Sequence, residues 1–278
     1  TTAYDFANGE IYVRFDESVR GCDAFVIQSH AAPINEAIME QLIMIDALKR
    51  ASAKRITVIL PFYGYARQDK KHLGREPISA RLMADLFLAA GADRLMTVDL
   101  HTAQIQGFFD GPVDHLLAMP ILTRYVRKNY GKKPLAVVSP DAGRIKVAEQ
   151  WARQFDNAPL AFIHKTRDVT KANVSKANRV VGEVEGRTCI LVDDLIDTGG
   201  TICQAAEALM NDGAAEVIIV STHAVFSGEA VNRLKDSVAT EVIVTNTLPL
   251  EDDKHFDKLT VLSIAPLLAQ AVSAVFED

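Results

Sequence analysis

A short glycine-rich segment combines the residue types that bind a phosphate group. It reads Asp-Thr-Gly-Gly-Thr, and it follows a short apolar run at residues 190–192 and two adjacent aspartates. A helix is predicted directly after it, at residues 202–210. Glycines let backbone N–H groups approach a ligand, while threonine hydroxyls and a helix N-terminus add donors and positive potential. We therefore predict a phosphate-monoester site formed by Asp197, Thr198, Gly199, Gly200 and Thr201.

The paired aspartates, Asp193 and Asp194, favour hydrogen bonding to a sugar beside that phosphate. We place them in a turn where the buried strand ends. A carboxylate repels a phosphate but accepts hydrogen bonds from sugar hydroxyls, as the acidic residue of dinucleotide-binding folds does. Strand alternation points the two side chains to opposite faces, so we expect one of them, Asp193, to meet the sugar. The competing interpretation is a solvated acidic turn that caps a helix.

Two further segments carry cations that suit an anionic ligand. Residues 62–76, FYGYARQDKKHLGRE, directly follow a predicted strand, which is where open α/β sheets bind their ligands. A solvated charged face is the alternative interpretation of this run. Lys165 and Arg167 follow another predicted strand, in a polar stretch that we interpret as a long loop reaching residue 178.

Composition restricts the class of protein. The 278 residues are 49% hydrophobic and 24% charged, which is typical of one or two ordinary globular domains. A formal net charge of −6 without a Lys/Arg stripe argues against a nucleic-acid partner. The three cysteines lack metal-ligand spacing, so we expect no disulfide framework and a reducing cytoplasmic compartment. We also expect no membrane partner, because no apolar run approaches the roughly 18 residues of a membrane span and no leader is recognisable.

Predicted strands and helices alternate along the chain, which indicates an α/β fold. Strands are predicted at 11–15, 23–28, 55–60, 95–100, 135–138, 160–163, 190–192, 216–221, 241–245 and 259–264. Helices are predicted at 34–49, 77–91, 145–155, 202–210, 229–235 and 266–276. We divide the chain into an N-terminal half, 1–114, and a C-terminal half, 115–278, at a crossover near residues 114–120.

Two segments carry a resemblance to a known family. VDDLIDTGGT, at residues 192–201, resembles the ribose-5-phosphate-binding loop of the type I phosphoribosyltransferase fold. DLHTAQIQGFFDGPVDH, at residues 99–115, resembles a signature of ribose-phosphate pyrophosphokinase, the phosphoribosyl pyrophosphate synthetase family. The resemblance extends over residues 6–276. It implies two tandem type I phosphoribosyltransferase-like domains, each a mostly parallel sheet flanked by helices, with ATP bound by the first and ribose 5-phosphate by the second.

The resemblance also implies an activity and a set of residue roles. The family transfers the β,γ-diphosphoryl group of ATP to the anomeric hydroxyl of ribose 5-phosphate, which gives 5-phosphoribosyl 1-diphosphate and AMP for nucleotide biosynthesis. The implied ATP contacts are Phe6, Asn8, Gly9, Glu10, Arg67, Gln68 and His101. The implied ribose 5-phosphate contacts are Arg167, Asp193, Asp197, Thr198, Gly199, Gly200 and Thr201. His101 and Asp141 are the implied Mg²⁺ ligands, and Lys165 and Arg167 the implied catalytic residues.

A cytoplasmic homohexamer with phosphate or nucleotide effectors is implied as well. Against the family pattern, we expect the chain to lack a first strand and helix and a short C-terminal tail, which would expose a sheet edge and remove part of an allosteric phosphate site. Arg144 stands where many relatives carry a second glycine.

Two alternatives remain, a simple phosphoribosyltransferase and a non-catalytic regulatory relative. A transferase would need only one such domain and no ATP loop. A regulatory relative should show damaged loop chemistry, whereas His101, Lys165, Arg167 and the glycine-rich segment are intact.

Overall fold

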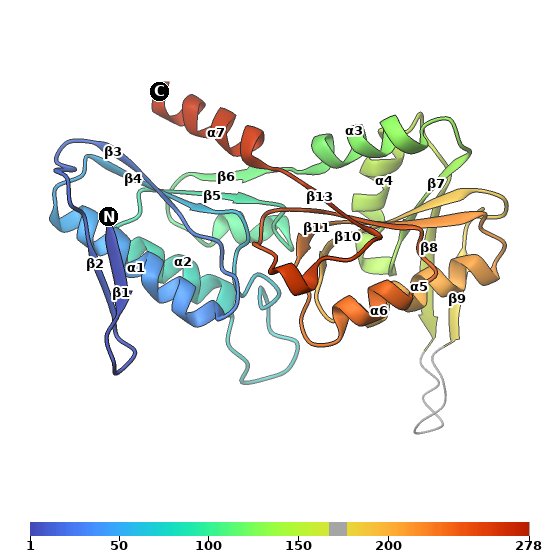
Figure 1. Ribbon diagram of the computed structural model, residues 1–278, viewed down its shortest axis with the longest axis horizontal. Helices are drawn as coiled ribbons and strands as arrows, with labels where there is room; N and C mark the ends of the chain where they lie inside the picture. Colours follow the sequence, from blue (N-terminus) through green and yellow to red (C-terminus); the bar gives the residue numbers. More distant parts are fainter. Residues whose placement is uncertain (167–176, 278) are drawn as a thin grey trace. The chain divides into compact units, whose positions relative to one another are not determined.

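The structure, a computed structural model, describes residues 1–166 and 177–277, and for residues 165, 166, 177 and 178 it describes the backbone alone. The chain forms two compact units (Figure 1). Unit 1 comprises Thr1–Leu117, Thr247–Pro249 and Ala265–Asp278, and unit 2 comprises Ala118–Asn246 and Leu250–Ile264. Both contain a largely parallel sheet with helices on its faces, which confirms the predicted α/β class.

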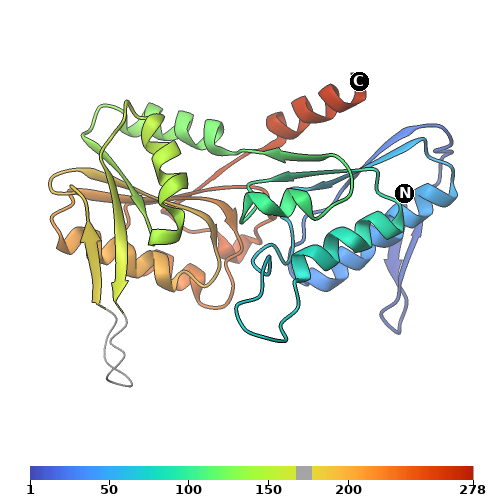
Figure 2. The same cartoon turned by 180° about the vertical axis from the view of Figure 1, so that it is seen from behind.

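Unit 1 is built on a parallel sheet of order β3-β4-β5-β6. Its strands are β3 (Asp23–Ile27), β4 (Arg55–Leu60), β5 (Arg94–Val98) and β6 (Val113–Leu116). Helices α1 (Ile34–Arg50) and α2 (Ser79–Ala90) lie side by side on one face, and α7 (Ala265–Glu277) lies on the other (Figures 1 and 2). β4 is buried from Ile56 to Leu60 and largely apolar, which is typical of a parallel strand covered on both faces. Its Val58 and Leu60 pack toward α1 and α2, while Ile59 packs with Val275 of α7.

An antiparallel hairpin completes unit 1. Its strands are β1 (Thr2–Asp5) and β2 (Ile11–Arg14), and only the second was expected. Gly9 has a φ of +86° in the connecting turn, a backbone conformation that glycine adopts without steric cost.

Unit 2 contains a seven-stranded sheet of order β13-β12-β11-β10-β7-β8-β9, parallel except for β9. The strands are β7 (Leu135–Ser139), β8 (Leu160–Thr166), β9 (Ala177–Val181), β10 (Thr188–Ile196), β11 (Glu216–Ala224), β12 (Glu241–Thr245) and β13 (Leu259–Leu262). Helices α3 (Met119–Tyr130) and α4 (Ile145–Arg153) cover one face, and α5 (Gly200–Asn211) and α6 (Ala230–Asp236) the other (Figure 1). Leu191, Val217 and Val242 pack with Leu209 of α5 and Leu234 of α6 in one buried cluster.

The strand order of unit 2 reverses between β7 and β10. From β7 the chain passes through α4 to β8 on one side, whereas from β10 it passes through α5 to β11 on the other. The connections after β7 and β10 therefore diverge from neighbouring strand ends. In open α/β sheets this switch point is where ligands bind. The fold thus brings the segments after residue 139 and after residue 196 to one place.

The observed units differ from the expected halves at two places. The expected boundary, between residues 114 and 115, falls inside β6, which pairs with β5 through Leu116 and Val98. The last helix, expected in the second half, belongs to unit 1 because Val275 packs against Ile59 and Met96. Strands β1, β6 and β9 and helix α3 were not expected.

Candidate functional site

The glycine-rich loop lies between β10 and α5, at the switch point of unit 2. Gly199 has a φ of +74°, so the left-handed turn favours glycine at this position. Gly200 has no such requirement, and a Cβ there would lie 3.6 Å from Nη1 of Arg233. Gly199 offers no side chain to cap α5, so the first-turn N–H groups of the helix are suited to an anionic ligand.

Contacts from the α6 side hold the carbonyl groups of this loop. The N–H of Ser227 donates to the carbonyl of Asp197 at 3.0 Å, and Nη1 of Arg233 donates to the carbonyl of Thr198 at 2.8 Å. These bonds satisfy the carbonyl groups of Asp197 and Thr198. They also stabilise the turn from which the N–H groups at the start of α5 can reach a ligand. Arg233 lies 35 positions from Thr198 in sequence, and no local pattern pointed to it.

The acidic pair lies inside a strand, which corrects the expectation of an acidic turn. β10 continues to Ile196 because β11 runs beside it, with Asp193 opposite Ser221 and Leu195 opposite His223. Pairing with β7 ends earlier, at Leu191. The aspartates therefore occupy a stretch of β10 that is held on the β11 side, beyond the last residue paired with β7.

Arg144 contacts both aspartates from the segment that follows β7. Its Nε lies 3.2 Å from Oδ1 of Asp193, and its Nη2 lies 2.6 Å from Oδ2 of Asp194. The side chain of Asp194 is only 7% exposed, against 21% for Asp193. Burial, followed by the charge of Asp194, raises the pKa of Asp193 well above its usual range, and the positive charge of Arg144 opposes this shift.

Asp141 also follows β7, on the same side of the switch point as Arg144. Its Oδ1 accepts the N–H of Gly143 at 2.8 Å, and its carbonyl accepts the hydroxyl of Ser139 at 2.6 Å. These bonds fix a half-buried carboxylate at a strand end. Unit 2 therefore assembles Asp141, Asp193 and the glycine-rich loop from the ends of two neighbouring strands.

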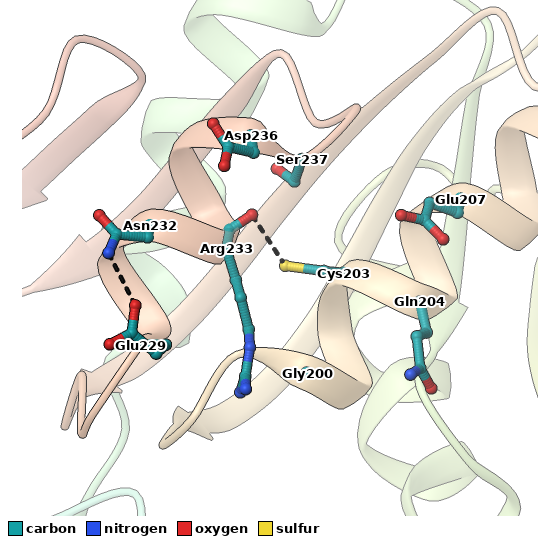
Figure 3. A pocket seen from close by; sticks show the side chains of 9 residues that line it. All are labelled: Gly200, Cys203, Gln204, Glu207, Glu229, Asn232, Arg233, Asp236 and Ser237. Carbon is teal, nitrogen blue, oxygen red and sulfur yellow. Dashed lines mark hydrogen bonds between the residues drawn. The ribbon is translucent and has the colours of Figure 1, made fainter.

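A hollow of about 750 Å³ lies outside the loop, between α5 and α6 (Figure 3). Arg233 extends toward Gly200 along it, and Sγ of Cys203 lies 3.5 Å from the carbonyl of Arg233. Glu207, Glu229 and Asp236 give the wall an acidic character. Of the residues predicted to bind ribose 5-phosphate, Gly200 alone lines this hollow, so it is a feature behind the loop rather than the predicted site.

The cationic segment after β4 is joined to the segment after β5 within unit 1. Asp69, 6% exposed, accepts bonds through Oδ2 from Oγ1 of Thr102 and Nε2 of Gln104, both at 2.8 Å. His101, half-buried, precedes Thr102 in the same segment. The structure therefore brings the basic loop close to the histidine segment, as binding of one ligand by both would require. Asp69 was not among the predicted site residues.

Arg67 and Gln68 lie on the surface of the basic loop. Oε1 of Gln68 accepts the hydroxyl of Ser79 at 2.7 Å, which ties this side chain to the start of α2. At the beginning of the loop, the N–H of Gly64 donates to Nδ1 of the buried His30 at 2.9 Å. Burial lowers the pKa of His30 to about 4, so the ring is neutral near neutral pH. A neutral histidine thus anchors the loop that carries Arg67.

Four of the predicted ATP contacts lie at the tip of the β1–β2 hairpin. Phe6, Asn8, Gly9 and Glu10 are all exposed. The ring of Phe6 lies edge-on to Tyr4, with centroids 5.4 Å apart, and Oδ1 of Asn8 accepts the N–H of Glu10 at 3.2 Å. The tip therefore exposes an aromatic ring and polar groups on the surface of the protein.

The predicted residues fall into two sets. The ATP set and His101 belong to unit 1, whereas Asp141, Asp193 and the loop at 197–201 belong to unit 2. The backbone of Lys165 pairs with Asn178 in the β8–β9 ladder, but its side chain and the whole of Arg167 lie outside the described residues.

The described part of the chain contains neither a cluster of metal ligands nor a membrane-spanning helix. Across residues 1–166 and 177–277, no three His, Cys, Asp or Glu side chains gather in a way that could hold a metal ion. Over the same residues, none of the helices has the length and apolar character that crossing a bilayer requires.

Two family models match separate parts of the chain. A family model described as the N-terminal domain of ribose phosphate pyrophosphokinase matches residues 1–91, and one described as the phosphoribosyl synthetase-associated domain matches residues 156–278. The ribose-phosphate pyrophosphokinase of Bifidobacterium longum is 65% identical over 280 aligned residues, covering 100% of this chain and 82% of that protein. The enzyme of the same name from Mycobacterium tuberculosis is 66% identical, covering 99% of this chain and 85% of that protein.

A solved structure is similar over almost the same extent. The crystal structure of phosphoribosylpyrophosphate synthetase from Mycobacterium smegmatis superposes with a TM-score of 0.95 at 66% identity, covering 99% of this chain and 90% of that one. Family models that together match more than half of the chain, and relatives of such identity over nearly its full length, place this protein in the ribose-phosphate pyrophosphokinase family.

Proposed function

We propose that this protein transfers the β,γ-diphosphoryl group of ATP to the anomeric hydroxyl of ribose 5-phosphate, which yields 5-phosphoribosyl 1-diphosphate and AMP for nucleotide biosynthesis. The observation that supports this choice is that two separate segments carry residues suited to an anion, and each follows a strand at the carboxyl end of its own largely parallel sheet. One is the glycine-rich loop after β10, and the other is the basic loop after β4. A simple phosphoribosyltransferase would need only the first.

In unit 2, the N–H groups at the start of α5 and the hydroxyls of Thr198 and Thr201 would bind the 5-phosphate. Asp193 would accept a hydrogen bond from a ribose hydroxyl, because its carboxylate lies on the neighbouring strand segment. The backbone of Gly199 supports phosphate binding by the loop, since its left-handed conformation turns the chain from β10 into α5.

In unit 1, Arg67, Gln68 and His101 would bind the nucleotide phosphates, and the hairpin residues Phe6, Asn8, Gly9 and Glu10 would hold the adenine. The reaction itself needs alignment more than covalent chemistry. The anomeric oxygen attacks the β-phosphorus as it loses its proton, and the bond from that phosphorus to the oxygen bridging to the α-phosphate breaks. AMP leaves with that oxygen. Lys165 and Arg167 would neutralise the charge that develops on the diphosphoryl group.

Asp141 fits a Mg²⁺ ion better than His101 does, because Mg²⁺ prefers hard oxygen ligands. A Mg²⁺ ion that arrives on nucleotide phosphates needs only one or two protein carboxylates, so a larger ligand cluster is not required. The half-buried Asp141 carboxylate, fixed through Gly143, meets that need. The ion would neutralise phosphate charge during the transfer.

We further infer a cytoplasmic homohexamer, in which the exposed hairpin tip reaches the nucleotide site of a neighbouring subunit, and control by phosphate or nucleotide effectors. Exposure of Phe6 at 46% supports the first inference, because a large ring at a hairpin tip gains stability when a partner covers it.

The test is an assay with ribose 5-phosphate, Mg²⁺ and ATP labelled at either the α- or the γ-phosphorus. We expect γ-label in phosphoribosyl pyrophosphate and α-label in AMP. Ribose is the matched control substrate, and it should react poorly because it lacks the phosphate that the loop binds. Label transfer from the α-position, or an absence of AMP, would contradict the proposal. Consumption of phosphoribosyl pyrophosphate with a nucleobase would indicate a transferase, and inactivity with retained binding of a family enzyme would indicate a regulatory relative.

A further inference from the structure

We propose that Arg144 is a positioning residue of the sugar site. Its guanidinium is anchored on Asp194 and fixes the Asp193 carboxylate for a ribose hydroxyl. The inference rests on the proposed function. It assigns separate roles to the two adjacent aspartates and a role to an arginine that is not among the implied site residues.

A single guanidinium bridges the two carboxylates. Nη2 of Arg144 lies 2.6 Å from Oδ2 of Asp194, and Nε lies 3.2 Å from Oδ1 of Asp193. The shorter contact is made with the more buried carboxylate, because the side chains of Asp194 and Asp193 are 7% and 21% exposed. Asp194 therefore serves as the anchor, and the more exposed Asp193 is the carboxylate that a ligand can reach.

Two contacts to Asp193 converge on one of its oxygens. Oδ1 accepts the backbone N–H of Asp194 at 2.9 Å in addition to its contact with Nε of Arg144. Two donors at one oxygen fix the rotation of the carboxylate group, and neither contact uses Oδ2. A ribose hydroxyl would then donate to Oδ2 of a carboxylate whose orientation is already set, which reduces the entropy lost on binding.

Arginine suits this position for reasons of charge and shape. Two adjacent, partly buried carboxylates repel each other, and the positive charge of Arg144 opposes that repulsion and favours the charged form of Asp193. The planar guanidinium has donors spaced to contact two groups at once, whereas a lysine ammonium is a point charge. Arg144 is also fixed at its backbone end, since it lies between the Asp141 turn and α4. It thus connects the segment after β7 with β10 across the switch point.

The experiment compares the wild type with Arg144→Gln, Arg144→Lys and the control Lys146→Gln, which removes the same charge from an exposed position on α4. Michaelis constants for ribose 5-phosphate and for ATP are measured separately. Ribose 5-phosphate is also titrated calorimetrically in the presence of α,β-methylene ATP, in which the bond that must break is not cleavable. Trp151 fluorescence monitors folding, because this residue lies in α4, the helix that begins directly after position 144.

For Arg144→Gln we expect the KM and Kd of ribose 5-phosphate to rise about tenfold or more, the effect of losing a charge-assisted contact, with the KM of ATP little changed. Arg144→Lys should lie between the wild type and Arg144→Gln, and Lys146→Gln should match the wild type. An unchanged or lower KM for ribose 5-phosphate in Arg144→Gln, or equal effects on both substrates, would overturn the proposal. If Arg144→Gln does not fold, Arg144→Lys decides, and a wild-type KM there would overturn the two-point contact. Failure of the wild type to bind ribose 5-phosphate would instead overturn the proposed function.

Discussion

Replacement of His30 by asparagine is expected to change the way in which the stability of unit 1 depends on pH. His30 is 1% exposed, its Nδ1 accepts the N–H of Gly64 at 2.9 Å, and its Nε2 lies 3.0 Å from Oε1 of Gln41. Since Nδ1 is an acceptor, Nε2 carries the proton and the ring is neutral. Protonation would direct a second ring N–H against the N–H of Gly64.

The magnitude follows from the pKa of the histidine, which burial lowers from 6.5 to about 4. Between these values the unfolded chain binds a proton that the folded chain does not, so stability is lost as the pH falls. Integration from pH 7 to pH 5 gives a loss of about 2 kcal/mol attributable to this residue. Asparagine has no such titration, and its Oδ1 can still accept the bond from Gly64. The difference in unfolding free energy between wild type and His30→Asn should therefore shrink by about 2 kcal/mol over this range.

The measurement must report on unit 1. The single tryptophan, Trp151, lies in unit 2, so its fluorescence follows the other unit. Native-state hydrogen exchange at amides of β4 gives the free energy of opening in the correct unit. Comparison of the two proteins under identical conditions cancels the contribution of every other titrating group. Parallel pH profiles for wild type and variant would refute the reasoning, as would a midpoint near 6.5 in a direct NMR titration of the His30 ring.

Three further predictions concern the proposed sites. Gly199→Ala should lower the free energy of unfolding by about 1–2 kcal/mol because φ is +74°, whereas Gly200→Ala should change it by about 0.5 kcal/mol or less; equal losses in thermal unfolding would contradict this. Asp69→Ala removes the acceptor shared by Thr102 and Gln104, so the KM for ATP should rise about tenfold while that for ribose 5-phosphate stays constant; a rise in both would count against a separate ATP site in unit 1. Lys165→Ala and Arg167→Ala should each lower turnover by about 10² with little change in substrate affinity, and Lys165→Arg should also be impaired; full turnover in the double alanine variant would exclude both residues from the transfer step.

Local patterns in the sequence were sufficient for much of the fold. The largely apolar run of β4 predicted a buried strand, because a strand covered on both faces needs apolar side chains at most positions. The spacing of Ile38, Leu42, Ile45 and Leu48 predicted α1. The glycine-rich segment predicted a loop between a strand and a helix, and this loop is present with Gly199 in the left-handed region. These features depend on neighbours within a few residues, so the sequence alone determines them.

Other features follow from pairing between distant segments. β10 extends through Asp193 and Asp194 because β11 accompanies it, and no local pattern shows how long a partner strand will be. The last helix joins unit 1 through packing of Val275 on Ile59, a contact that the order of elements along the chain does not specify.

The contacts that hold the proposed sites in place also depend on segments that are distant in the sequence. Arg144 reaches Asp193 and Asp194 because the sheet order places β7 next to β10, and Arg233 reaches Thr198 because α6 lies beside α5. The sequence determined which residue types stand in each loop, and thereby the phosphate and sugar chemistry that we propose for them. Only the tertiary structure decided which distant side chains hold those loops in place, because a side chain can bind only what the order of strands and helices brings within its reach.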